Sequence, residues 1–145
     1  MVILALDYGE KRIGVALSDA DESFVFSRPF IKRQGNAQAI SKIIELIAKE
    51  DIGLILLGAP YNMDDSISET MEKVLLFKKS LQKKINYTTR LIKRPSVVLW
   101  DERNTTTEAR RILLKQDVSR KKRKEVVDSL AASILLEDYL RHKGA

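Results

Sequence analysis

Four acidic residues stand beside apolar segments of the chain, where a folded core would hold their carboxylates in fixed directions. Asp7 ends the apolar run at positions 2–6, and Asp101 with Glu102 ends a second run at positions 97–100. A run that is apolar on both faces is typical of a central strand, and a carboxylate at its end suits a metal ligand. Taken alone, the Asp-Tyr-Gly segment that opens at Asp7 suits a simple turn equally well.

The fourth acid, Asp128, lies in the last predicted helix, which covers roughly positions 124–141. Ala131 and Ala132 follow it at i+3 and i+4, so the three side chains share one face of that helix. Small side chains let a helix lie close to a sheet, and Leu135 would anchor the same face in the core. This pattern predicts that the Asp128 carboxylate approaches the ends of the strands.

Acids brought together in this way favour a bound cation. Neighbouring carboxylates raise each other's pKa by repulsion, and a divalent cation removes that repulsion. Mg²⁺ prefers a few carboxylates, waters and phosphate oxygens, and Mn²⁺ accepts similar ligands. The reaction that follows is phosphodiester hydrolysis, in which the metal activates water and neutralises the leaving oxygen.

The competing interpretation is that each acid is merely exposed or paired with a base, as is usual for most of the chain's 20 acidic residues. Glu102 would then pair with Arg103, and Asp101 would cap a following helix. The only histidine, His142, lies three residues from the last residue, and we expect it to be solvated rather than catalytic. The joint placement of the four acids favours the metal site.

The composition is that of one soluble domain with a basic surface. The 145 residues are most economical as a single domain over residues 1–145, and 44% of them are hydrophobic. The formal net charge of +6 favours a polyanionic partner such as nucleic acid. The absence of cysteine excludes disulfides and thiolate metal sites. The first residues lack the pattern of a signal peptide or a membrane span, so we expect a cytoplasmic protein without a membrane partner.

The apolar pattern predicts three strands followed by alternating helices and strands, which implies an α/β fold with a mixed sheet. Pro29 cannot donate a hydrogen bond to a neighbouring strand, so the third strand should lie at an edge of the sheet or be interrupted at this residue. The expected strands cover positions 2–7, 13–18, 24–32, 52–57 and 97–100.

The predicted helices begin at Asn36, at Ser66, at Thr105 and near position 124. Ser66 and Thr105 each precede a glutamate by three residues, which is the spacing of a capping box. The first two helices have buried stripes at i, i+3, i+4 and i+7 spacing or close to it. Those stripes are Ile40, Ile43, Ile44 and Ile47 in the first helix, and Val74, Phe77, Leu81 and Ile85 in the second.

A run of basic residues stands directly before Asp128. Such a run is usually a solvated loop, but this one lies about one helical turn from a candidate metal ligand. We therefore favour a clamp on the phosphate backbone of a nucleic acid. The run consists of Arg120, Lys121, Lys122, Arg123 and Lys124.

Four segments of the chain resemble the YqgF/RuvX family, whose members are described as Holliday junction resolvases or as nucleases that mature pre-16S ribosomal RNA. The segments are D-Y-G-E-K-R-I-G-V-A from position 7, G-A-P-Y-N-M-D from 58, D-E-R-N-T-T from 101 and D-S-L-A-A-S-I-L from 128. The D-x-G opening also occurs in sugar kinases and actin-like ATPases. Those proteins pair two such domains, and this chain has room for one and no G-x-G-x-x-G cluster.

The resemblance implies a ribonuclease-H-like mixed five-stranded sheet with the first strand central and helices on both faces. It also implies a metal-dependent nuclease whose site is formed by Asp7, Glu102 and Asp128, with Asp101 as a further candidate acid. Neighbouring side chains of a strand point to opposite faces, so Asp101 and Glu102 should not be equivalent ligands.

The expected substrate is structured RNA, cut during 5′-end maturation of pre-16S rRNA, and the alternative is branched DNA, cut by Holliday junction resolution. A resolvase must cut two strands symmetrically, which favours a homodimer over a monomer. A third possibility is a non-catalytic nucleic-acid-binding domain of the same fold. Besides the basic run, the residues expected to contact nucleic acid are Arg12, Asn62 and Arg103.

Two residues depart from the family pattern. Asp65 stands where the family usually has glycine, and it would be more strained than glycine if that position needs a positive φ. Asn104 follows D-E-R in place of the usual leucine, which we expect to be harmless because asparagine is a good helix cap.

Overall fold

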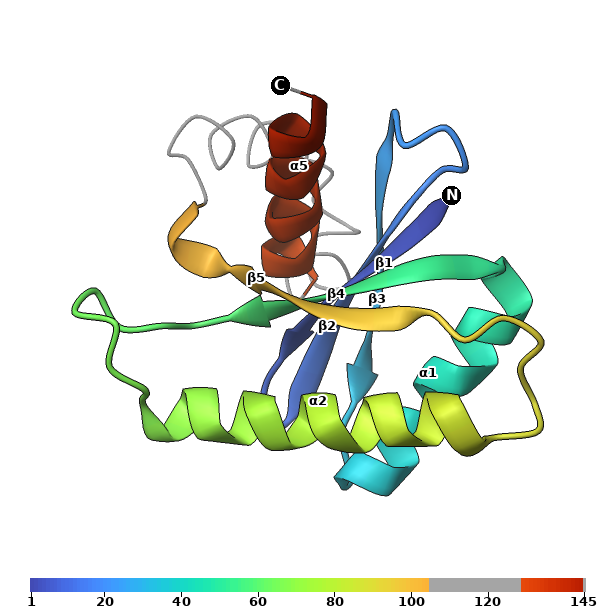
Figure 1. Cartoon of the computed structure of the whole chain (residues 1–145), viewed down its shortest axis with the longest axis horizontal. Helices are drawn as coiled ribbons and strands as arrows, with labels where there is room; N and C mark the ends of the chain where they lie inside the picture. The colour runs from blue at the N-terminus through green and yellow to red at the C-terminus, as the bar shows by residue number, and fades with distance from the viewer. Residues whose placement is uncertain (105–128, 145) are drawn as a thin grey trace.

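The structure, a computed structural model, describes residues 1–104 and 129–144 and contains one five-stranded sheet (Figure 1). The spatial order of the strands is β3-β2-β1-β4-β5, so the first strand is central, as predicted. β1 pairs antiparallel with β2 and parallel with β4, β3 is antiparallel to β2, and β5 is parallel to β4. The strands are β1 (Val2–Tyr8), β2 (Arg12–Ser18), β3 (Val25–Lys32), β4 (Ile52–Ala59) and β5 (Ser96–Asp101).

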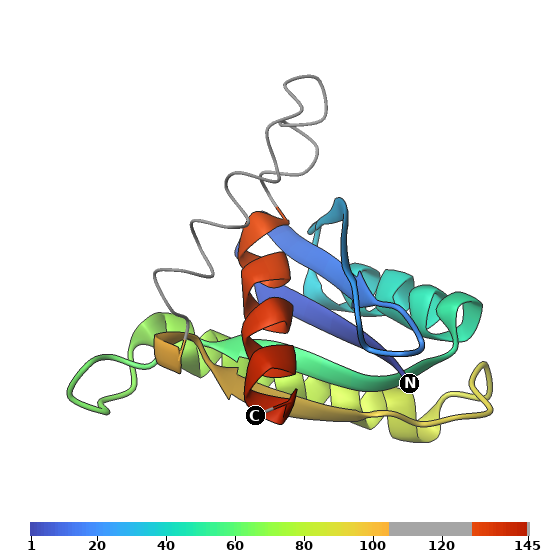
Figure 2. The same cartoon turned by 90° about the horizontal axis from the view of Figure 1, so that it is seen from above.

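Helices cover both faces of the sheet (Figures 1 and 2). Helices α1 (Asn36–Glu50) and α2 (Glu69–Tyr87) lie on one face, and α5 (Leu130–Gly144) crosses the other. A short 3₁₀ helix, η1 (Glu102–Asn104), follows β5 directly. The mixed five-stranded sheet with helices on both faces is therefore confirmed. Among the described residues, no helix is long and apolar enough to cross a membrane.

The alternation of side chains along β1 assigns each residue to one of these two faces. Leu4 and Leu6 are buried against α1 and α2, whereas Ile3 and Ala5 are buried against α5. Both helical stripes predicted from the sequence are buried in the α1–α2 layer. Asp7 continues the alternation of Ile3 and Ala5, so its side chain belongs to the α5 face.

The edge position of β3 also confirms a prediction, and it has a local consequence. The pairing of β2 with β3 shifts register between Ile13 and Val15, so that Gly14 lies opposite the two residues Pro29 and Phe30. An extra residue of this kind is a β-bulge, which removes regular ladder hydrogen bonds and bends the strand. Proline, which has no N–H to donate, fits such a position.

The predicted start of α2 is wrong by two residues. Ser68, not Ser66, is the N-cap, and its hydroxyl accepts a hydrogen bond from the N–H of Met71 at 3.1 Å. Ser66 is engaged in the preceding loop, where its hydroxyl donates to Asp64 at 2.6 Å and accepts from the Asn62 amide at 2.8 Å. The capping-box spacing to Glu69 selects Ser66, whereas the serine that caps the helix directly precedes Glu69. The helix predicted from Thr105 lies outside the described residues.

Candidate active site

Two of the predicted acids, Asp7 and Glu102, meet on the α5 face of the sheet. Asp7 is near the end of β1, and Glu102 is the first residue of η1, directly after β5. Strand β4 lies between these strands, and their carboxyl groups share a hydrogen bond across it. The structure thus brings together two of the three acids that were predicted to converge.

Gly58 of β4 makes this convergence possible. A Cβ atom at position 58 would lie only 2.6 Å from Oε1 of Glu102, which is closer than real Cβ contacts come. The absence of a side chain at Gly58 thus lets the Glu102 side chain cross the strand and reach Asp7. Glycine within a strand often marks such a close approach.

The electrostatics of the pair are those of a site that favours a cation. Burial raises the pKa of Asp7, and the hydrogen bond with Glu102 opposes that rise in part. Two hard oxygen donors, one of them poorly hydrated, match the ligand preference of Mg²⁺. The described residues contain no group of three acids or histidines that would hold a metal on their own. Asp128, the predicted third ligand, lies outside them.

The chain is firmly held at the residue next to Asp128. Ser129 is fully buried, and its hydroxyl accepts from the N–H of Val15 at 3.1 Å and donates to the carbonyl of Arg28 at 2.5 Å. These two backbone groups belong to the β2–β3 bulge, where the regular ladder is interrupted. The Ser129 hydroxyl therefore satisfies polar groups that the bulge would leave unpaired, and it ties the start of α5 to the sheet.

The predicted packing face of α5 is partly wrong. Ala132 and Leu135 are buried as expected, but Ala131 is exposed. The buried face instead includes Ser133, whose hydroxyl is hydrogen-bonded to that of Ser27 in β3. Close approach is thus achieved by paired serines as well as by alanine, a pattern that the apolar periodicity does not reveal.

Asp101 is directed away from the Asp7–Glu102 pair. Its carboxylate accepts from Nε of Arg103 at 3.0 Å and from Nη2 of Arg103 at 2.7 Å. This guanidinium lowers the pKa of Asp101. Asp101 and Glu102 were expected not to be equivalent ligands. This arrangement agrees with that expectation, because Asp101 forms an ion pair with Arg103.

Arg103 joins the end of β5 to the loop between β4 and α2. Its Nη1 donates to the Asp65 carboxylate at 2.8 Å and to the carbonyl of Asn62 at 2.9 Å, and its guanidinium lies 5.3 Å from the centre of the Tyr61 ring. Asp65 does adopt a positive φ, 66°, as its replacement of a glycine suggested. The ion pair between Asp65 and Arg103 was not predicted. The arginine of the D-E-R-N-T-T segment was a possible signal for it.

The other residues predicted to bind nucleic acid differ in their surroundings. The Arg12 guanidinium lies 5.5 Å from the centre of the Phe30 ring, and the exposed amide of Asn62 donates to Ser66. Their role remains a prediction. The basic run at positions 120–124 lies outside the described residues.

The contacts of Trp100 were not predicted from the sequence. Its indole N–H donates at 3.1 Å to Asp138, a fully buried carboxylate of α5. His142 is not simply solvated, since its ring packs edge-on against Trp100 and its Nδ1 is hydrogen-bonded to the carbonyl of Asp138. The position of Asp138, three residues after Leu135 on the buried face, was a signal for burial.

A family model and named relatives match nearly the whole length of this chain. The family model described as "RuvX: Holliday junction resolvase" matches residues 1–142. A Thermoanaerobacter pseudethanolicus protein named "Putative pre-16S rRNA nuclease" is 39% identical over 97% of this chain and 96% of its own length. A Halothermothrix orenii protein of the same name is 41% identical over 99% and 97%.

Two solved structures show the same fold at low sequence identity. Thermus thermophilus RuvC, in complex with a Holliday junction substrate, matches with a TM-score of 0.55 at 11% identity, over 98% of this chain and 96% of that chain. Fowlpox virus resolvase, in complex with Holliday junction DNA, matches with a TM-score of 0.58 at 13% identity, over 99% of each chain.

Proposed function

We propose that this chain, which belongs to the RuvX family, is a nuclease that hydrolyses phosphodiester bonds at the Asp7–Glu102 site, with the 5′ end of pre-16S rRNA as its substrate. The observation that carries the proposal is the hydrogen bond between the carboxyl groups of Asp7 in β1 and Glu102 in η1, which a purely structural role does not require. The names of relatives about 40% identical over nearly the whole chain support the choice of RNA.

The site is proposed to use a divalent cation, with Mg²⁺ as the preferred ion and Mn²⁺ as a substitute. Asp7 and Glu102 supply hard oxygen donors, and Asp128 is the proposed third ligand. When bound, such a cation activates water and stabilises the leaving oxygen. The protein contributes the fixed directions of the donors: Gly58 admits Glu102, and Arg103 holds the end of β5 against the neighbouring loop.

Cleavage of a 5′-extended precursor rRNA tests this proposal, with Asp7→Asn and Glu102→Gln as variants. Loss of a proposed ligand should cost at least about a hundredfold in rate, because even outer-shell partners of metal sites cost up to that much. The exposed Asp21→Asn variant is the matched control and should cleave normally. Cleavage should require Mg²⁺ or Mn²⁺ and stop in EDTA. Unchanged cleavage by Asp7→Asn would show that the site is elsewhere.

A second candidate function, resolution of Holliday junctions, is favoured by the family description and by the fold of the junction-bound neighbours. A four-way DNA junction assayed beside the RNA separates the two substrates. Symmetric cleavage of the junction by a dimer, with no cleavage of the RNA, would favour the resolvase. Binding of nucleic acid without cleavage of either substrate, with or without Mg²⁺, would favour a non-catalytic role.

A further inference from the structure

The outer face of α2 carries a stripe of lysines that has no part in the site described above. Lys78, Lys79 and Lys83 line an open groove of about 520 Å³, together with the exposed Tyr87. The remaining lining residues are Leu75, Gln82 and Asn86. All seven positions follow i, i+3, i+4, i+7, i+8, i+11, i+12 spacing, so they form one continuous face of the helix.

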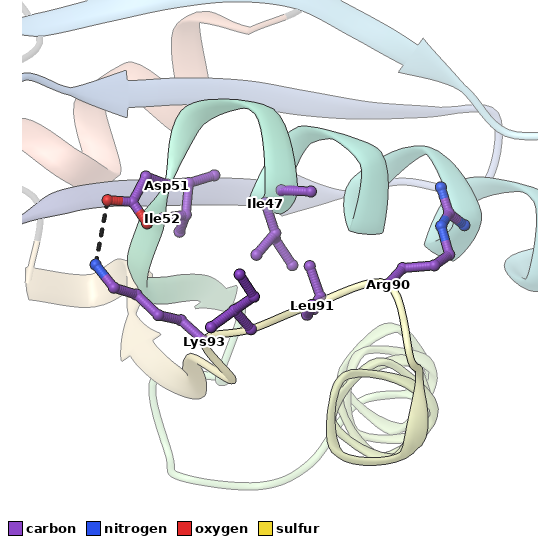
Figure 3. A pocket seen from close by; sticks show the side chains of 8 residues that line it. Ile47, Asp51, Ile52, Arg90, Leu91 and Lys93 are labelled. Carbon is purple, nitrogen blue, oxygen red and sulfur yellow. Dashed lines mark hydrogen bonds and ion pairs between the residues drawn. The ribbon is translucent and has the colours of Figure 1, made fainter.

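The positive charges of these three lysines are concentrated on one face of α2. Within the described residues, none of the three makes an ion pair with an acid. A second hollow, of about 260 Å³ beside the end of α1, shows the contrast (Figure 3). There, Lys93 pairs with Asp51 at 3.1 Å and Arg90 pairs with Glu45 at 3.5 Å. Three unpaired cations on one helix face form a local positive field that attracts an anion.

The polar neighbours of the lysines are already occupied, which leaves the lysines as the binding groups. Gln82 donates to Asn86 at 3.1 Å and accepts from the N–H of Val97 at 2.7 Å, so its side chain fixes α2 against the start of β5. The stripe therefore borders the β5 edge of the sheet. Because Asp7 and Glu102 lie on the opposite, α5 face, a nucleic acid that reaches both regions must pass around this edge.

We propose that this face of α2 binds the phosphate backbone of a double-helical stem of the RNA substrate, outside the segment that is cut. The inference rests on the proposed nuclease function and adds a second contact to it. From Lys78 to Tyr87 the helix extends about 14 Å, at about 1.5 Å per residue. A duplex carries a charge for about every 1.7 Å, so roughly eight phosphates fall within this length.

The chemistry of the stripe favours a duplex over a single strand or an acidic protein. Single-strand sites rely on several aromatic side chains for base stacking, and this face offers only Tyr87. Lysines on flexible stems suit a backbone that is read by shape, and the Tyr87 hydroxyl can donate to a phosphate. A docking site for a protein typically has a central apolar patch, whereas Leu75 is the only aliphatic residue in this lining.

The test measures binding in EDTA, so that it does not depend on cleavage. The triple variant Lys78→Gln/Lys79→Gln/Lys83→Gln is compared with Lys42→Gln/Lys49→Gln/Lys93→Gln, which removes the same charge elsewhere. Glutamine is a good helix former, so both variants should keep the fold, as circular dichroism will verify. The probes are an RNA with a stem beside its 5′ extension and the same extension as a single strand.

For the stem-containing RNA, the α2 variant should bind about tenfold more weakly than the control variant at fixed salt. The slope of log affinity against log salt should fall by about two to three, one for each lost phosphate contact. Binding of the single strand should be equal for the two variants. Equal affinity of both variants for the stem-containing RNA would overturn the proposal. So would an equal loss of affinity of the α2 variant for the stem-containing and the single-stranded RNA. A third contrary result would be that polyglutamate displaces the stem-containing RNA from the protein as effectively as duplex RNA does. Loss of cleavage in the Asp7→Asn variant is scored separately, so failure of one proposal does not imply failure of the other.

Discussion

At the scale of single residues, two acids at the ends of neighbouring segments differ in what they contribute to the stability of the fold. Asp7 has a raised pKa because its carboxylate is largely removed from water, whereas Asp101 has a lowered pKa because Arg103 pairs with it. The two strand-end acids therefore have opposite electrostatic roles. The ionised form of Asp7 is disfavoured by burial, whereas the ionised form of Asp101 is stabilised by its ion pair with Arg103.

This contrast gives a prediction of opposite sign for two similar substitutions. In EDTA at neutral pH, Asp7→Asn should raise the Tm and Asp101→Asn should lower it, each by a few degrees, where ~1 kcal/mol is worth about 3–5 °C. A raised pKa in the folded state means that the stability due to Asp7 is present below its ordinary value of 3.8 and is lost as the pH rises. For Asp101 the contribution is present above 3.8 and is lost as the pH falls.

Thermal unfolding across pH measures both effects, and Mg²⁺ should raise the Tm of the unsubstituted protein by binding the folded state. Stabilisation by Mg²⁺ should disappear in Asp7→Asn. An equal decrease in Tm for Asp7→Asn and Asp101→Asn would contradict the inference that burial of the ionised Asp7 destabilises the fold.

Gly58 supports a second prediction at this scale. In Gly58→Ala, the new Cβ would displace the Glu102 carboxylate, so the cleavage rate should fall by about tenfold to a hundredfold while the helical and strand content is retained. Gly53→Ala is a matched control in the same strand, because its Cβ would meet only side-chain atoms of Met1, which is exposed and can move aside. Equal cleavage rates for the two variants would show that cleavage does not require the close approach of Glu102 to Asp7.

At the scale of elements, α5 is joined to the sheet by hydroxyl groups as well as by apolar packing. Ser129 occupies the bulge between β2 and β3, and Ser133 meets Ser27 in β3. Trp100 at the end of β5 adds a hydrogen bond to the buried Asp138. Through these contacts the helix that follows Asp128 is fixed to three strands.

Removal of the Ser129 hydroxyl should therefore be costly. Ser129→Ala leaves the N–H of Val15 and the carbonyl of Arg28 buried without their partner, which should lower the free energy of unfolding by about 1–3 kcal/mol. Ser133→Ala should cost less, because the Ser27 hydroxyl is only half-buried and can turn to water. Urea denaturation measures the difference. Faster hydrogen exchange at the Val15 amide identifies the cause, and an unchanged exchange rate there would refute it.

The strands were predicted better than the helix faces, for physical reasons. Apolar runs and Pro29 determine β1, β4 and the edge position of β3 through burial and through a missing donor. The start of α2 depends on which of two serines caps it, and the orientation of α5 depends on Ser129 and Ser133, whose partners are distant in sequence. Hydrogen bonds of this kind are not visible in local periodicity.

At the scale of the whole molecule, the sheet separates two kinds of surface. The acids of the candidate site lie on the α5 face, and the unpaired lysines lie on α2, which covers the other face. The convergence of Asp7 with Glu102 was predictable, because strand ends of a parallel pair and their neighbour meet at one edge. The groove on α2 could not be predicted from the sequence, because it depends on which lysines have no acidic neighbour in the folded structure.

The position of β5 also bears on how copies of this protein behave at high concentration. In the described part of the chain β5 pairs with one strand only, β4, and Val98 on it is 41% exposed. An open edge of this kind is a template for strand addition and amyloid-like aggregation. Gln82 accepts a hydrogen bond from the N–H of Val97, and the positive charges of the neighbouring lysines should repel the same face of a second copy. We therefore expect substitution of these lysines by neutral residues to favour self-association through β5.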